Sequence, residues 1–259
     1  MKTRLLALAA SLIIIASLAL PLAGAAQPAA GLHIVFLPNI TKPDQDSVQP
    51  GGTIVFSEDF EGAFPGTWIV VDRDKATNGE YYWAKRNCRA FSGSYSGWAV
   101  GGGANGSSLA CGSDYPNNAH SVMINGPFSL EGATAGNFKL KLLLNSEEND
   151  YFFLGASVDG QEFYGNYVAG YSDGWVTMSL DLTKIYELGN IVGKPRVWIA
   201  VGFESDGANT LAAGAYVDDI VLSKYTPSST TSAPTAQSVT IEPNVGNVVI
   251  KPTKLTIER

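Results

Sequence analysis

Acidic residues are concentrated at two places that are far apart in the sequence. Asp59 and Glu61 lie near the start of the strand-rich region, and Asp218 and Asp219 lie inside the apolar run 215–222. Burying an unpaired anion costs several kcal/mol, so carboxylates within such a run need a partner. Oxygen ligands without His or Cys suit Ca²⁺. We therefore predict a structural calcium site at these four residues; the alternative is that Asp218 or Asp219 accepts hydrogen bonds at a strand end and no ion binds.

The first acidic cluster does not match the pattern of a glycan-cleaving enzyme. A retaining glycosidase needs two carboxyl groups about 5–5.5 Å apart, whereas Glu58, Asp59 and Glu61 are divided between the two faces of a strand. The chain has no Gly-x-Ser-x-Gly and no His-Glu-x-x-His motif, and only two His and two Cys. This inventory argues strongly against a His- or Cys-rich zinc site, and we predict a protein that is not an enzyme.

Tyrosines form a second candidate site around the glycine-rich turn 169–174. Tyr164, Tyr167 and Tyr171 flank or occupy this turn. Sugar rings stack on exposed aromatic faces, while nearby Asp and Asn bind hydroxyl groups. We predict a ligand-binding site at these three residues; the alternative is that the rings pack in the core or against loops, which we favour for Trp175.

The two cysteines, Cys88 and Cys111, form an even pair in a loop-rich stretch. In an exported chain such a pair is most simply a disulfide, and the alternative is two free thiols. The closed loop would contribute about 3 kcal/mol in a chain-entropy model. It would fix the glycine-rich segment 101–106, which has few side chains to pack.

These residues must be positioned by strands, because strand signals separated by Gly, Asn or Asp recur from 52 to 224. Asp159-Gly160 is a strong hairpin signal between two of them. Only Leu182–Leu188 has a helical pattern, of one or two turns. The pattern predicts an all-β fold, a two-sheet antiparallel jelly-roll sandwich in which the first and last strands pair. The strand segments are 53–57, 68–71, 81–84, 121–124, 138–144, 151–158, 161–168, 175–182, 197–203 and 215–222.

The chain ends differ in composition from this central domain, which we place at 52–225. Residues 1–26 combine Lys2 and Arg4 with an apolar run and small residues, as in a secretory signal peptide; the alternative is an uncleaved anchor. We interpret 27–51 as a linker and 226–237 as a Ser/Thr/Pro linker. The strand-like tail 238–259 is too short to bury a core alone. It docks on the domain, exchanges with a partner, or frays.

Composition and charge limit the partners. Charged residues make up 16% of the chain, below the roughly 25% of an average soluble protein. The net charge is −7, and it becomes −9 when the signal and its two cations are removed. An acidic chain lacks the clustered Lys and Arg that nucleic acid requires. We therefore expect a secreted, extracellular protein with no nucleic-acid partner and no stable membrane insertion after signal cleavage.

Four segments resemble one family in order and spacing. Together they resemble the MAM-like jelly-roll domains of the choice-of-anchor J type, which also accompany the catalytic domain of immune inhibitor A metalloproteases. The resemblance covers about Thr53–Lys224 and implies a concanavalin-like jelly roll with an adhesion, binding or accessory role. It also implies calcium between a first-strand acid and a last-strand Asp, the positions of Asp59, Glu61 and Asp218. The segments are Asp59–Gly62 with Phe64-Pro65 and Trp68, Phe91–Ser96, Ser157–Gly160 and Gly214–Ile220.

The leading hypothesis from the sequence is a secreted, non-catalytic binding module for glycans or surface polymers with a structural calcium site. The alternative is a structural or adhesion protein of the cell surface that binds other proteins through a sheet face or its C-terminal strands.

Overall fold

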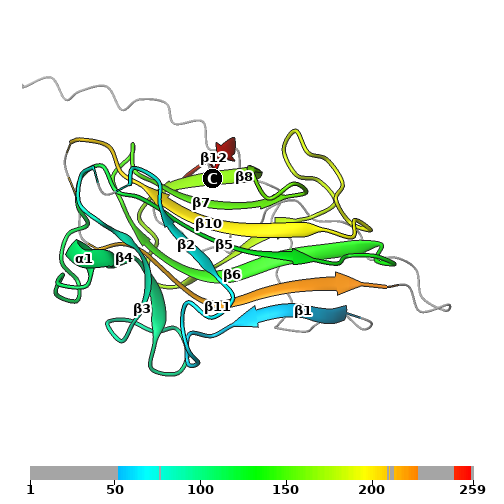
Figure 1. The fold of residues 1–259 in the computed structure, drawn as a ribbon, viewed down its shortest axis with the longest axis horizontal. Coiled ribbons are helices and arrows are strands. Elements are labelled where there is room, and N and C mark those ends of the chain that lie inside the picture. The colour runs from blue at the N-terminus through cyan, green and yellow to red at the C-terminus, as the bar shows by residue number, and fades with distance from the viewer. Residues whose placement is uncertain (1–51, 76, 209, 211–212, 227–247, 258–259) are drawn as a thin grey trace, which may run out of the picture. The chain divides into compact units, whose positions relative to one another are not determined.

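The computed structural model describes residues 52–75, 77–208, 210, 213–226 and 248–257 (Figure 1). The predicted signal peptide 1–26, the linker 27–51 and nearly all of the 226–237 linker lie outside the described residues. Among those that are described, no helix has the length and apolar character needed to cross a membrane.

The described chain forms two antiparallel six-stranded sheets, which confirms the predicted two-sheet, all-β architecture (Figure 1). The first sheet has the order β3-β4-β11-β6-β9, and β1 also pairs with β11. The second sheet has the order β12-β8-β7-β10-β5-β2. The strands are β1 Gly52–Glu58, β2 Ile69–Asp72, β3 Tyr82–Arg86, β4 Ser96–Gly102, β5 His120–Phe128, β6 Ala135–Asn145, β7 Tyr151–Ser157, β8 Glu162–Gly170, β9 Val176–Asp181, β10 Val197–Glu204, β11 Gly214–Tyr225 and β12 Val248–Thr256.

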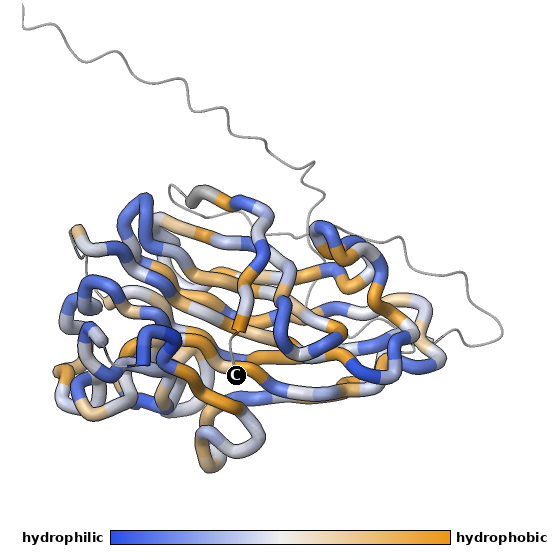
Figure 2. Tube along the Cα trace, turned by 45° about the horizontal axis from the view of Figure 1, so that its top comes forward, coloured by the Kyte–Doolittle hydropathy of each residue, from blue (hydrophilic) through white to orange (hydrophobic). Residues whose placement is uncertain are grey.

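The core lies between the sheets because successive side chains of a strand point to opposite faces. In β6, Phe138, Leu140 and Leu142 are buried in the main core. Lys139 and Lys141 alternate with them and are exposed and half-buried, respectively. Hydrophobic and hydrophilic residues alternate along the strands in Figure 2. Each fully buried large apolar side chain contributes about 1.5–3 kcal/mol, so this alternation fixes which face of β6 turns inward.

Strand β11 joins the two ends of the domain, as the sequence predicted for the first and last strands. Its first half pairs with β4 at Tyr216 and Val217, and its second half pairs with β1 from Ile220 to Tyr225. The register against β6 is irregular between Asp218 and Val221. Asp218 and Asp219 therefore lie where β11 changes partner along one edge.

Strand β4 was not predicted, because its three glycines are more typical of a loop than of a strand. A Cβ atom at Gly97 would lie 2.6 Å from the Cζ of Phe60, and one at Gly102 would lie 2.7 Å from the Tyr82 ring. Gly in a strand interior marks such close approaches. The prediction of helical turns at Leu182–Leu188 was wrong, since that segment forms non-helical turns; the only described α-helix is the single turn α1, Gly103–Gly106.

The predicted disulfide Cys88–Cys111 is confirmed, with a Cα–Cα distance of 5.1 Å. It closes the segment that contains β4 and α1. The Arg86 guanidinium also donates to the carbonyl oxygens of Gly101, Gly106 and Leu109, at 2.9, 3.3 and 2.7 Å. The glycine-rich segment is thus held by a covalent bond and by one half-buried cation.

Candidate functional site

Asp218 and Asp219 hold the loop 91–95, which follows Cys88. Asp218 is fully buried, and its Oδ2 accepts hydrogen bonds from the backbone N–H of Phe91 at 2.8 Å and of Ser92 at 3.2 Å. Its Oδ1 accepts from the N–H of Asp219, and the Asp219 carboxylate accepts from the Ser92 hydroxyl at 2.8 Å. Burial raises the pKa of Asp218, while these N–H groups oppose the shift.

Glu61 holds the other end of the same loop. Its Oε1 accepts from the N–H groups of Ser94 and Tyr95, both at 2.8 Å. Gly93, which precedes them, has φ +60°, and a Cβ there would be 2.4 Å from this carboxylate oxygen, so the position favours glycine. The Asp59 carboxylate accepts from the N–H of Glu61 at 3.0 Å. The four predicted metal ligands thus accept protein hydrogen bonds, and calcium binding by them stays a prediction.

A shallow groove, which we call the Phe91 groove, lies on the first sheet beside this loop and has a volume of about 350 Å³. Its lining residues come from β1, β6, β9 and β11 and from the segments that follow β1 and β3. Its polar and aromatic lining includes Asp59, Phe91, Lys139, Lys141, Thr177 and Asp219.

The groove combines an exposed ring with donors and acceptors. Phe91 is 44% exposed, and its ring meets the half-buried ring of Trp175 edge-on at a centroid distance of 6.1 Å. The Lys141 ammonium lies 4.5 Å from the Phe91 centroid and donates to the Thr177 hydroxyl at 2.9 Å. A cation this close to a ring face is attracted by it, and the contact fixes Lys141 within the groove.

The structure does not bring the predicted tyrosines into one surface. Tyr164 and Tyr167 lie three residues apart on β8 and pack against different apolar clusters. The Tyr167 ring stacks on Tyr151 at 5.3 Å, and its hydroxyl donates to Glu204 at 3.2 Å. Burial and the nearby Glu204 carboxylate raise the pKa of Tyr167. Tyr171 follows the strand and is 50% exposed, so of the three it has the most freely accessible ring.

Sequence reasoning missed one acidic group. Glu147, Asp150 and Asp206 place carboxylate oxygens within 4.8 Å of one another, so this group could hold a metal ion. Asp150 is buried, and it accepts from the Tyr115 hydroxyl at 2.5 Å and from the N–H of Asp206 at 2.7 Å. Desolvation raises the pKa of Glu147, and the charges of the other two carboxylates raise it further. Neither ion pair among the described residues involves the group.

Neither this acidic group nor the Phe91 groove has a local sequence signature. Glu147 and Asp150 lie in the turn between β6 and β7, and Asp206 follows β10, so only the pairing of β7 with β10 brings them together. The groove likewise depends on neighbouring strands. The one available signal was the alternation Lys139-Leu140-Lys141, which marks an outward face.

No family model matches the chain, and no curated protein matches it. Among solved structures, the chain is similar to the K1 cleaved adhesin domain of Lys-gingipain from Porphyromonas gingivalis W83, with 14% identity and a TM-score of 0.43 over 64% of this chain and 96% of that one. It is also similar to the CBM22-1 xylan-binding domain of Paenibacillus barcinonensis Xyn10C, with 12% identity and a TM-score of 0.38 over 69% and 98%. These low values assign no function to the chain.

Proposed function

We propose that the protein is a secreted, non-catalytic binding module that binds a glycan or another surface polymer in the Phe91 groove. The observation that carries the proposal is the exposed Phe91 ring, which lies beside the Lys141 ammonium and the Thr177 hydroxyl in one open groove. Membership of the MAM-like, choice-of-anchor J family remains part of the proposal.

The chemistry of the groove suits a saccharide. The C–H face of a sugar ring packs on an aromatic ring, and its hydroxyl groups both donate and accept hydrogen bonds. Lys139 and Lys141 supply donors, and Asp59 and Asp219 supply acceptors around the ring. An open groove of this kind admits part of a longer polymer, whereas a closed pocket would admit only a small ligand.

The proposal is tested by a glycan array probed with the signal-free protein, residues 27–259, and with F91A. The matched control is Y186A, which removes another exposed ring, 43% accessible, outside the groove. We expect F91A to weaken binding by up to about tenfold, since an aromatic contact contributes about 0.5–1.5 kcal/mol, and Y186A to bind as wild type does. Binding that survives F91A but is lost in Y171A would place the site at the predicted tyrosines instead, and no binding to any glycan would contradict the proposal.

A structural calcium ion is the second part of the proposal. Two positions are open to it: the predicted residues Asp59, Glu61, Asp218 and Asp219, and the acidic group Glu147, Asp150 and Asp206. We favour the second, because its oxygens converge without a cationic partner among the described residues. Hard carboxylate oxygens are the ligands that Ca²⁺ prefers, and an ion there would tie the β6–β7 turn to the end of β10.

Calcium titration of the chelated protein separates these positions. Glu147 and the exposed Glu148 are adjacent, so E147Q and E148Q form a matched pair. We expect Ca²⁺ to raise the melting temperature of wild type and E148Q but not of E147Q. A response that persists in E147Q and is lost in E61Q and D219N would place the ion at the predicted residues. A wild type with neither heat nor a melting shift would remove calcium from the proposal.

A second candidate function is protein adhesion at the cell surface. The observation that favours it is β12, which comes from the C-terminal tail and completes a sheet edge through main-chain pairing with β8.

A further inference from the structure

The C-terminal strand β12 lies along the free edge of β8, which we call the seat of this strand. Strand β12 pairs with β8 from Val248 opposite Gly170 to Thr256 opposite Glu162, and β8 is its single partner in the described sheet. On its other side, β8 pairs with β7. Without β12, the main-chain groups on the free side of β8 would have no strand to bind.

The strand also completes an apolar cluster separate from the main core. Leu255 and Ile257 are only 3% and 6% exposed, and they pack in this cluster with residues of four other strands. Those residues are Val122 and Ile124 of β5, Phe153 of β7, Phe163 of β8, and Trp198 and Ala200 of β10. Such an apolar patch needs a cover, which the strand supplies.

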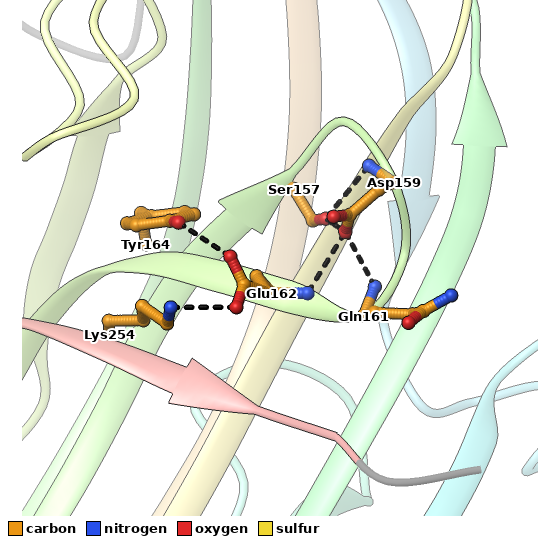
Figure 3. Close-up of polar contacts among 6 residues, drawn as sticks. All are labelled: Ser157, Asp159, Gln161, Glu162, Tyr164 and Lys254. Carbon is orange, nitrogen blue, oxygen red and sulfur yellow. Dashed lines mark hydrogen bonds and ion pairs between the residues drawn. The ribbon is translucent and has the colours of Figure 1, made fainter.

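Polar contacts fix the register of the strand on this seat (Figure 3). The Lys254 ammonium lies 2.7 Å from Glu162 Oε1, and the Tyr164 hydroxyl donates to the other oxygen of Glu162 at 2.8 Å. Beyond the ion pair, the N–H of Ile257 donates to the carbonyl of Gln161 at 2.9 Å, and Arg73 donates to the carbonyl of Thr256 at 3.1 Å.

The seat itself is held by its own hairpin. Asp159 Oδ1 accepts from the N–H of Gln161 at 2.8 Å and from that of Glu162 at 2.9 Å, and it also accepts from the Ser157 hydroxyl (Figure 3). These N–H bonds lower the pKa of Asp159, against the opposing effect of its burial. None of these contacts involves β12, so the hairpin presents the same seat to a strand from any copy of the chain.

The covalent link to the strand is long. Residues 227–247 separate the end of β11 from β12, and a chain of this length spans up to about 75 Å when extended. Because loop closure depends only weakly on length, such a link allows the strand to reach the β8 edge of its own domain or that of a neighbouring copy. A second copy offers an identical seat with the same apolar and charged contacts.

We infer that β12 is an exchangeable strand, and that two copies of the chain associate by each placing Val248–Ile257 on the β8 edge of the other. Exchange of an identical element preserves every contact described above and is a low-cost route to a closed dimer. Strand β12 also contains Pro252, which has no N–H, and the exposed Lys251. Both features disfavour pairing with a further strand, and reciprocal exchange closes the association at two copies. This inference is independent of the proposed glycan site.

Inter-copy disulfide trapping tests it directly. Asn166 and Pro252 are register partners, so N166C in one tagged copy and P252C in a differently tagged copy come together only when the strand is exchanged. The two variants are mixed at high concentration, oxidised and separated without reductant. We expect a cross-linked species with both tags, and none when N166C is replaced by S129C in the loop after β5.

The double variant N166C/P252C supplies the second measurement. Oxidised at high dilution, it locks the strand on its own domain, and light scattering should then give a monomer at every concentration, whereas the wild-type mass should rise toward that of a dimer. The inference is overturned when the double variant cross-links within one chain but the mixed single variants never cross-link. A wild type that stays monomeric at every concentration overturns it too.

Discussion

At the scale of single residues, the acidic side chains of the first sheet act as acceptors for one loop. Asp218 accepts three backbone N–H groups from a fully buried position, and Glu61 accepts two more from the far end of the loop. Phe91 begins this loop, so the same carboxylates position the ring on which the proposed function depends.

The first prediction concerns Asp218. We expect D218A to lower the free energy of unfolding by about 1–3 kcal/mol, because it leaves the part-buried N–H donors of Phe91, Ser92 and Asp219 without this acceptor. Urea denaturation measures the change, and D173A, at an exposed position, serves as control. A D218A protein as stable as D173A would show that the carboxylate does not anchor the loop.

The second prediction concerns pH. Burial, reinforced by a hydrogen bond with Asp74, raises the pKa of Asp72 to about 6. The folded state therefore binds a proton more tightly than the unfolded state, for which the ordinary value is 3.8. Stability from this group is full below about pH 4 and is lost as the pH rises through about 6.

We expect the D72N variant to show a flatter fall in melting temperature between pH 4 and 7 than the wild type. The amide retains an oxygen that can accept from the N–H of Tyr81, so the fold is preserved. The pKa of Asp74 is lowered, so the stability that this group contributes is lost only as the pH falls below about 4, outside this window. Parallel pH profiles for the two proteins would rule out Asp72 as the source.

At the scale of elements, the C-terminal strand is the clearest case of a segment whose structure depends on its neighbours. We expect L255A to destabilise the protein by about 2–4 kcal/mol, because Leu255 is 3% exposed within the second apolar cluster. The control I250A lies on the same strand, but its side chain is 42% exposed, and we expect a change below about 1 kcal/mol. Equal effects in the two variants would mean that the strand does not seal the cluster.

Elements with a local signal were predictable from the sequence. The strands on either side of Asp159-Gly160 form the β7–β8 hairpin, and the pairing of β1 with β11 follows the expectation for first and last strands. Strand β4 was missed because glycines replace its side chains where Phe60 and Tyr82 approach the backbone. The residues of the tail alone could not decide between docking, exchange and fraying. The apolar side chains that the tail covers belong to other strands.

At the scale of the whole molecule, the candidate site is a product of tertiary pairing. The sequence predicted one site at Asp59, Glu61, Asp218 and Asp219. In the structure, Glu61, Asp218 and Asp219 bind the loop 91–95, and Asp59 and Asp219 line the Phe91 groove. Lys139, Lys141 and Thr177 enter the groove only because β6 pairs with both β9 and β11. No pattern in the sequence encodes that convergence.

The two proposed interactions use different sheets. The Phe91 groove lies on the first sheet, and β12 belongs to the second. A dimer formed by strand exchange would therefore keep both grooves available, and two linked grooves would bind a repetitive polymer with higher avidity than one. Avidity of this kind needs no additional contact within either groove.

The central claim is that the Phe91 groove is the ligand site, and an NMR titration of the ¹⁵N-labelled protein with the best glycan from the array tests it most directly. We predict that the largest shift changes occur at the amides of Phe91, Lys139, Lys141, Thr177 and Asp219, and that they disappear in F91A. Changes centred on Tyr164, Tyr167 and Tyr171, with the groove amides unmoved, would contradict the claim.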